Sequence, residues 1–131
     1  MKTDAQSARI LLAEDNVVSR TVAIMQLKKL GHQADAVQTG REAVTAQAKQ
    51  PYGLILMDCE MPDMDGFEAT KEIRRTEGPA RRTPIVAMTA SGRDEDRQKC
   101  VDAGMDDFIT KPVNNEVLRS MLDRWLAPRD E

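Results

Sequence analysis

LILMD, residues Leu54–Asp58, is a run of four apolar side chains that ends at a carboxylate. The run follows Pro51 and Gly53, which are turn-forming residues, and polar and apolar residues do not alternate within it. This pattern is typical of a strand that is buried on both faces, as in a parallel sheet with helices on either side. Ligands of such sheets bind beyond the carboxyl ends of the strands, so we expect Asp58 to lie at a functional site.

Short apolar runs alternate with helical stretches along the rest of the chain. The expected strands cover residues 9–13, 33–37, 54–58, 84–88 and 107–109, and the expected helices cover about 17–30, 39–50, 66–75, 93–103 and 117–126. This alternation implies a five-stranded parallel sheet with right-handed crossovers. Because the 33–37 segment is partly polar, as an edge strand can be, the strand order 2-1-3-4-5 follows. We therefore predict a doubly wound α/β fold in a single domain over residues 1–131, with a core from about 9 to 126.

The composition limits the possible functions. A net charge of -3 and a pI near 5.3 argue against a nucleic-acid-binding surface, and aromatic residues, at 3%, are too few for a base-stacking platform. There is no apolar window of about 18 residues and no apolar core of a signal peptide near the N-terminus, so we expect no direct membrane contact. The two cysteines, Cys59 and Cys100, suit reduced thiols in or near the core and a cytoplasmic location.

Side chains that can carry chemistry stand where four of the expected strands end. They are Glu14, Asp15, Asp58, Thr89 and Lys111. Because the carboxyl ends of parallel strands meet at one edge of a sheet, we expect all of them to face one pocket. Three carboxylates in one pocket repel one another. A magnesium ion removes that repulsion, since it prefers oxygen ligands and keeps positions open for water and phosphate.

The other two members of this set fit phosphate chemistry. Lys111 can hold a phosphate oxygen as a point charge, and Thr89 can donate a hydroxyl hydrogen bond to the same group. A carboxylate nucleophile, a metal ion, an ammonium group and a hydroxyl are what phosphoryl transfer onto Asp58 requires. Taken singly, each residue is most simply a turn former or a solvated charge. Their joint placement at the strand ends favours a site.

Four motifs in this chain resemble those of the receiver domain of two-component response regulators. They are LLAEDN at 11–16, LMDCEMPDMDG at 56–66, MTA at 88–90 and ITKP at 109–112. The resemblance covers residues 9 to about 126 and implies a flavodoxin-like (βα)5 receiver fold with a phosphoacceptor function. The second motif, together with AGMDD at 103–107, is most similar to receivers attached to hybrid sensor histidine kinases.

The resemblance also implies a role for each residue of the pocket. Asp58 would accept a phosphoryl group from a phosphohistidine on a histidine kinase or a histidine phosphotransfer protein. Asp15, Asp58 and the main-chain carbonyl of Glu60 would bind Mg²⁺, with Glu14 acting through a metal-bound water. Lys111 would hold the phosphoryl group.

Further features follow from the same resemblance. The peptide bond between Lys111 and Pro112 would be cis. Thr89 and Phe108 match the switch positions of the family, and we expect phosphorylation to pull Thr89 inward and to turn Phe108 toward the space it vacates. The expected helix over 93–103 has few apolar residues to hold it, which makes this region easy to move.

The expected helix over 17–30 has more apolar residues than one buried stripe needs. We expect part of this surplus to be exposed at Val17, Val18 and Val22, beside the pocket, because the helix begins just after Asp15. An exposed apolar patch next to a reactive site usually marks an interface. In receivers the same helix docks a histidine-bearing helical bundle. The alternative is that the surplus packs under the final helix.

His32 is the only histidine of the chain. It follows Gly31, which ends the expected helix, and it therefore belongs at the end of the fold opposite Asp58. We expect it to be solvated, and we expect the phosphodonor to lie in another domain or protein.

Two other functions stay open. An aspartyl-phosphate phosphatase usually places a second acid two residues after the nucleophile, where Glu60 stands, but short loops leave little room for a substrate pocket. A pseudo-receiver that only docks a partner is disfavoured. Clustered acids in a pocket destabilise a fold, and a protein that only docks a partner would not need them. We expect the isolated chain to be monomeric, either as a single-domain regulator or as part of a larger kinase.

Overall fold

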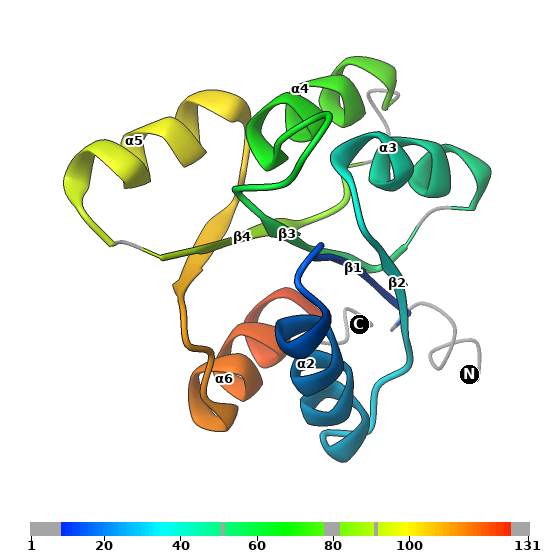
Figure 1. Cartoon of the computed structure of the whole chain (residues 1–131), viewed down its shortest axis with the longest axis vertical. Helices are drawn as coiled ribbons and strands as arrows, with labels where there is room; N and C mark the ends of the chain where they lie inside the picture. The colour runs from blue at the N-terminus through cyan, green and yellow to red at the C-terminus, as the bar shows by residue number, and fades with distance from the viewer. Residues whose placement is uncertain (1–8, 51, 78–81, 91, 127–131) are drawn as a thin grey trace.

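The structure, a computed structural model, describes residues 9–50, 52–77, 82–90 and 92–126 (Figure 1). Strands and helices alternate along these residues. The strands are β1 (Ile10–Ala13), β2 (Ala34–Val37), β3 (Leu54–Asp58), β4 (Ile85–Thr89) and β5 (Asp107–Thr110). The helices are α2 (Val17–Lys29), α3 (Gly40–Lys49), α4 (Gly66–Thr76), α5 (Asp94–Ala103) and α6 (Asn115–Leu126). None of these helices combines the length and the apolar character that crossing a bilayer demands.

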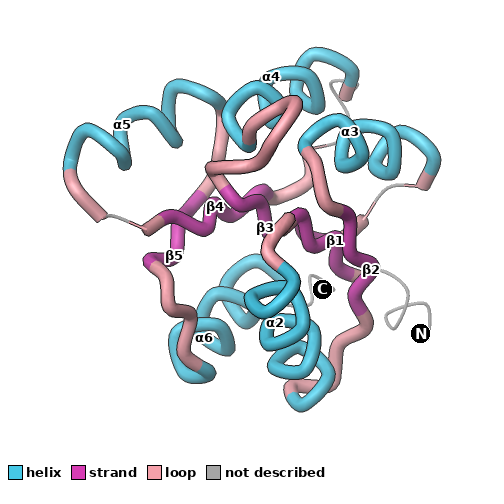
Figure 2. Tube along the Cα trace, viewed as in Figure 1, coloured by secondary structure: helices cyan, strands magenta, loops and turns pink. Residues whose placement is uncertain are grey.

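The strands form one parallel sheet in the order β2-β1-β3-β4-β5, which confirms the predicted doubly wound α/β fold. Helices α3, α4 and α5 cover one face of the sheet, and α2 and α6 cover the other (Figure 2). Successive residues of the central strands alternate between two apolar clusters. Leu11 and Ala13 belong to the cluster with residues of α3, α4 and α5, whereas Ile10 and Leu12 belong to the cluster with residues of α2 and α6. A central strand of this sheet therefore needs apolar side chains at successive positions until it reaches its carboxyl end.

Polar side chains set where several helices begin. The N-cap side chain of α2, α3 and α4 accepts a hydrogen bond from the backbone N–H three residues on, and these caps are Asn16, Thr39 and Asp65. Helix α6 begins at Asn115, two residues before Val117, the first apolar residue of its expected stripe, because Asn114 Oδ1 accepts from the N–H of Val117 at 2.8 Å. Helix α5 begins at Asp94, after Arg93 in the cap position.

The loop that follows Asp58 packs tightly between the sheet and two helices. A Cβ added at Gly66 would lie 2.2 Å from the carbonyl oxygen of Asp58, and one added at Gly40 would lie 2.2 Å from the carbonyl oxygen of Met64. The N–H of Gly40 donates to the Met64 carbonyl at 3.0 Å, and that of Gly66 donates to the Cys59 carbonyl at 3.1 Å. Glycine at both helix starts is what allows this approach. The loop is thereby held against the end of β3.

Cys59 and Cys100 are buried free thiols, as the sequence predicts. Burial raises the pKa of the Cys59 thiol, and the neighbouring Cys100 and Asp58 raise it further. A thiol with a raised pKa stays protonated and is a poor nucleophile. Cys59 therefore serves as an apolar wall beside Asp58.

Candidate functional site

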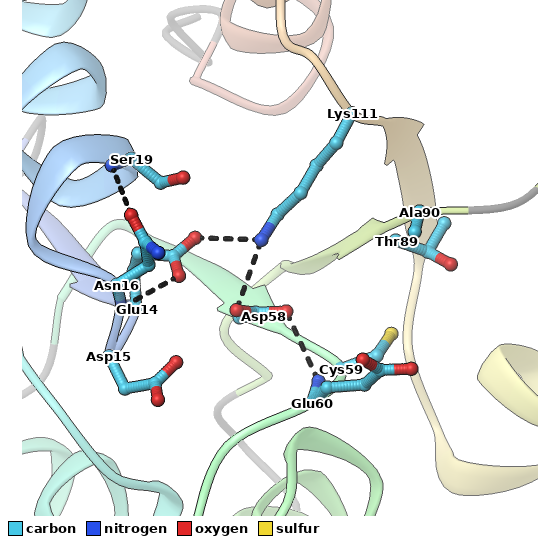
Figure 3. A pocket seen from close by; sticks show the side chains of 10 residues that line it. All are labelled: Glu14, Asp15, Asn16, Ser19, Asp58, Cys59, Glu60, Thr89, Ala90 and Lys111. Carbon is cyan, nitrogen blue, oxygen red and sulfur yellow. Dashed lines mark hydrogen bonds and ion pairs between the residues drawn. The ribbon is translucent and has the colours of Figure 1, made fainter.

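The carboxyl ends of β1, β3, β4 and β5 meet at a cavity of about 220 Å³ (Figure 3). The residues that line it are Glu14, Asp15, Asn16, Ser19, Asp58, Cys59, Glu60, Thr89, Ala90 and Lys111. Every residue that the sequence analysis selects for a catalytic or metal-binding role is among them. The structure thus brings together side chains from distant parts of the chain.

Three of the lining residues form an acidic cluster. One carboxylate oxygen from each of Glu14, Asp15 and Asp58 lies within 4.8 Å of the others. Glu14 and Asp58 are only 2% and 5% exposed, whereas Asp15 is open to solvent. Oxygen donors with one side open to water suit a hard divalent cation such as magnesium. The residues of this cluster therefore fit a metal ion.

Lys111 reaches from the end of β5 to a point between two of these carboxylates (Figure 3). Its Nζ lies 2.9 Å from Glu14 Oε1 and 3.1 Å from Asp58 Oδ2. Burial alone would lower the pKa of Lys111, but its hydrogen bonds to Glu14 and Asp58 outweigh burial and raise it. The ammonium group is therefore charged at neutral pH. The peptide bond from Lys111 to Pro112 is cis, as the resemblance implies.

The surroundings of Asp58 shift the pKa of its carboxyl in both directions. Burial raises the pKa of its carboxyl to about 6, and the side chain of Glu14 raises it too. The N–H of Glu60, which donates to Asp58 Oδ1 at 3.1 Å, and the ammonium of Lys111 lower it in part. The charged form of Asp58 is thus less favourable than that of a solvated aspartate, as long as no metal ion occupies the acidic cluster.

This raised pKa has a consequence for stability in the presence of a chelator. Because the pKa of Asp58 is about 6 in the folded chain and ordinarily 3.8, the protonated carboxyl stabilises the fold. This contribution to the free energy of unfolding is complete below pH about 4 and is lost as the pH rises through about 6. From pH 4 to 7 we expect the free energy of unfolding of the wild type to fall, relative to Asp58→Asn, by up to about 3 kcal/mol. Denaturant unfolding of both proteins in chelator measures this. A difference between them that does not change with pH would contradict the expectation.

The two residues matched to switch positions lie in different surroundings. Thr89 ends β4 and lines the cavity at 9% exposure. Phe108 lies outside the cavity on β5, where it is half-buried. Its ring packs beside Gly92, since a Cβ added there would lie 3.7 Å from Phe108 Cε2. The guanidinium of Arg97 on α5 lies over this ring, 5.0 Å from its centroid.

An apolar patch is exposed on α2 next to the cavity. This α2 patch consists of Val17, Val18, Val22 and Met25, which are 63%, 71%, 47% and 62% exposed. The buried side of the helix is made by Ala23 and Leu27 instead. The alternative, in which the apolar surplus packs under the final helix, is therefore wrong for these four residues. Val17 and Val18 stand in the first turn of α2, directly after the acidic loop.

His32 lies at the opposite end of the sheet from the cavity, but the expectation that it is solvated is wrong. The main-chain N–H of His32 donates to the carbonyl of Leu27 at 2.9 Å, which folds the chain back at the end of α2. The side chain is half-buried and lines a second cavity with Arg9 and Lys28. Among the described residues, no group hydrogen-bonds its Nδ1. Arg9 precedes β1 and Glu14 follows it, so His32 stands at the far end from Asp58.

Two residues outside the predicted site, Asn16 and Arg20, shape the acidic loop. The N–H of Asn16 donates to Glu14 Oε2 at 3.1 Å, and its side chain caps α2 through Ser19. An asparagine directly before a helical pattern is a recognisable cap signal, so the role of Asn16 could have been found. Arg20 donates to main-chain carbonyls of the loop. Nothing in the local sequence indicates that contact.

Known proteins that are similar to this chain include receiver domains and histidine kinases. The family model for the response regulator receiver domain matches residues 10–123. Probable histidine kinase 1 of Oryza sativa subsp. indica is 37% identical over 95% of this chain, which spans only 16% of that protein's length.

Two solved structures with similar folds are informative. The receiver domain of the sensor histidine kinase PA1611 from Pseudomonas aeruginosa PAO1, with magnesium coordinated in its active-site cleft, has a TM-score of 0.85 and 43% identity, covering 93% of this chain and 99% of that one. The receiver domain of Saccharomyces cerevisiae Ssk1, in co-crystal with the histidine phosphotransfer protein Ypd1, has a TM-score of 0.84 and 32% identity over 92% of this chain and 89% of the other. The chain described here belongs to the response regulator receiver domain family.

Proposed function

We propose that this chain is a signalling phosphoacceptor that takes a phosphoryl group from a phosphohistidine of a partner onto Asp58. The observation that carries the proposal is the place of Asp58, a buried carboxylate at the end of β3 with Lys111 and two further carboxylates around it. In the transfer, an oxygen of Asp58 forms a bond to phosphorus while the bond from phosphorus to the imidazole nitrogen breaks. The electron pair of the broken bond returns to the imidazole.

The other residues of the cavity position the group and balance its charge. Lys111, already 3.1 Å from Asp58 Oδ2, would hold an oxygen of the phosphoryl group. The hydroxyl of Thr89 would donate to another oxygen. Asp15, Asp58 and the carbonyl of Glu60 would bind Mg²⁺, with Glu14 acting through a water. The bound ion would neutralise the charge that develops on the transferred oxygens. The magnesium in the PA1611 receiver supports this assignment.

A small-molecule phosphodonor tests the proposal without any partner. With acetyl phosphate and Mg²⁺, we expect the wild-type chain to gain one phosphoryl group, seen as a shift in intact mass. With a chelator in place of Mg²⁺, we expect the shift to disappear, because the single ammonium of Lys111 would not balance three carboxylates and a phosphoryl group without a divalent cation. Equal uptake in the two conditions would contradict the metal requirement.

The competing phosphatase makes a different prediction for the same sample. A phosphatase would use Glu60 as a second acid, but the Glu60 side chain is exposed to solvent in this structure. We expect the chain to take up one phosphoryl group and not to turn over p-nitrophenyl phosphate. Multiple turnovers per molecule would favour the phosphatase.

We also propose that phosphorylation moves Thr89 toward the phosphoryl group and shifts Phe108 toward the space that Thr89 leaves. Two observations support this. Helix α5 buries only Cys100 and Ala103 of its ten residues, so little apolar surface holds it. Arg97 of this helix lies over the Phe108 ring, so a movement of either group reaches the other.

Backbone amide shifts measure this switch. On addition of beryllofluoride, which mimics a bound phosphoryl group, we expect shifts to extend from residue 89 through α5 to residue 108. In Arg97→Ala, which lacks the contact to the ring, we expect smaller shifts in α5, while those at residues 58–60 are kept. Arg75→Ala, which removes an exposed arginine of α4, is the control. Shifts confined to residues 58–60 in the wild type would contradict the switch.

The partner, we propose, is a histidine phosphotransfer protein or the histidine-bearing bundle of a kinase, and it docks on the α2 patch. The patch begins directly after Asp15, so a helix lying on it can bring its histidine to the cavity. The complex of the Ssk1 receiver with Ypd1 supports a partner of this kind.

A further inference from the structure

Arg20 contacts the acidic loop that joins β1 to α2. Its Nη1 donates to the carbonyl oxygen of Glu14 at 3.2 Å and to that of Asp15 at 3.3 Å. These are the main-chain atoms of two of the three residues in the acidic cluster. Among the described residues, no carboxylate lies within ion-pair distance of Arg20. The guanidinium of Arg20 therefore binds the backbone of this loop.

The loop is unevenly supported without Arg20. Glu14 is held by its own N–H, which donates to the Val37 carbonyl at 3.0 Å, and by Asn16 and Lys111 at its carboxylate. Asp15 is exposed, and in the part of the chain that the structure describes its carbonyl accepts a side-chain hydrogen bond only from Arg20. The peptide that joins Asp15 to Asn16 is thus held on one side by its N–H, which donates to Glu14 Oε2, and on the other by Arg20, the only side chain of α2 that donates to its carbonyl among the described residues.

We infer that Arg20 is a positioning residue for the metal site, because it holds the backbone of Glu14 and Asp15 in the orientation that brings their carboxylates to Asp58. The inference rests on the proposed function and concerns its metal-binding step. Groups that orient metal ligands through hydrogen bonds typically change metal affinity when they are removed. The charge of Arg20 acts in the opposite direction, since a cation beside the cluster repels a metal ion. If Arg20 acts by positioning, its removal weakens Mg²⁺ binding, whereas if it acts only by its charge, its removal strengthens Mg²⁺ binding.

The experiment compares Mg²⁺ affinities by titration, following the backbone amide signals of residues 14–16 and 58–60. We expect Arg20→Met to bind Mg²⁺ about tenfold more weakly than the wild type, because the two carbonyls lose their donor. Arg20→Lys, which keeps a charged donor, should recover part of the loss. Lys28→Met is the matched control. It removes one positive charge from an exposed position of the same helix, and its affinity should stay within about twofold of the wild type.

Thermal unfolding in chelator shows whether each variant keeps its fold, and a purely structural role of Arg20 would lower the unfolding temperature without a separate loss of affinity. Equal or tighter Mg²⁺ binding by folded Arg20→Met would overturn the inference. If Arg20→Met does not fold, Arg20→Ala, which also lacks a donor, takes its place, and affinity equal to that of the wild type would overturn the inference in the same way. A wild-type chain that binds no Mg²⁺ would instead contradict the metal role in the proposed function.

Discussion

Asp58→Asn is expected to abolish phosphoryl uptake from both acetyl phosphate and a phosphohistidine donor. The amide keeps the shape of the carboxylate and can still lie beside Lys111, but it is not a nucleophile toward phosphorus. The substitution also removes one of the three carboxylates of the acidic cluster. Intact mass after incubation with each donor measures the effect, and no phosphorylated species should rise above background.

Two controls make this result specific. Asp63→Asn changes an exposed aspartate in the loop after β3, where Asp63 pairs with Arg41 at 2.9 Å, and should keep wild-type uptake. Asp15→Asn keeps the nucleophile but loses a cluster carboxylate, so its uptake should recover as the Mg²⁺ concentration is raised. Uptake by Asp58→Asn at the wild-type rate would place the acceptor at another residue.

Val18→Glu is expected to slow transfer from a protein donor while leaving transfer from acetyl phosphate within about twofold of the wild type. Val18 is 71% exposed and belongs to the α2 patch, so a charge there should disturb docking without disturbing the core. Replacement of a hot-spot residue of an interface costs about 2 kcal/mol, which corresponds to roughly a thirtyfold loss in kcat/KM. Rates with a phosphorylated histidine phosphotransfer protein as the donor measure this.

Val101→Glu is the matched control for Val18→Glu. Val101 is also a valine on a helix, 64% exposed, but it lies on α5 at the other face of the sheet. Transfer from the protein donor should be unchanged in this variant. Equal losses with both donors in Val18→Glu would indicate damage to the fold. Unchanged rates after glutamate substitution at Val17, Val18 and Val22 in turn would place the interface elsewhere.

The fold was largely predictable because a strand that is buried on both faces appears in the sequence as an uninterrupted apolar run. The runs that form β1, β3 and β4 are apolar up to the carboxyl end of each strand, where the first polar residue stands, so their limits can be read without a structure. The cavity followed from the same signal, since the residue after a buried strand of this kind must stand at one edge of the sheet. The apolar stripe of α6 indicates the helix but not its first residue, which is set by the cap at Asn114.

Contacts made by long side chains were not predictable. Lys111 bridging Glu14 and Asp58, Arg97 over the ring of Phe108 and Arg20 on the acidic loop all depend on which groups the fold brings within reach. Several rotamers of a lysine or arginine are close in energy in the unfolded chain, so the choice among them is made by the tertiary structure. The partial burial of His32 has the same origin, because it depends on how the turn after α2 packs.

The groups that would bind the phosphoryl moiety come from the ends of four strands, and Glu14 and Lys111, which form an ion pair in the folded protein, lie far apart in the sequence. Such a constellation exists only after the sheet is complete, because no local segment contains it. If Asp58 is the acceptor, as proposed, an incompletely folded chain would lack the surrounding groups that phosphoryl transfer requires. Phosphoryl uptake would therefore report on folded molecules alone.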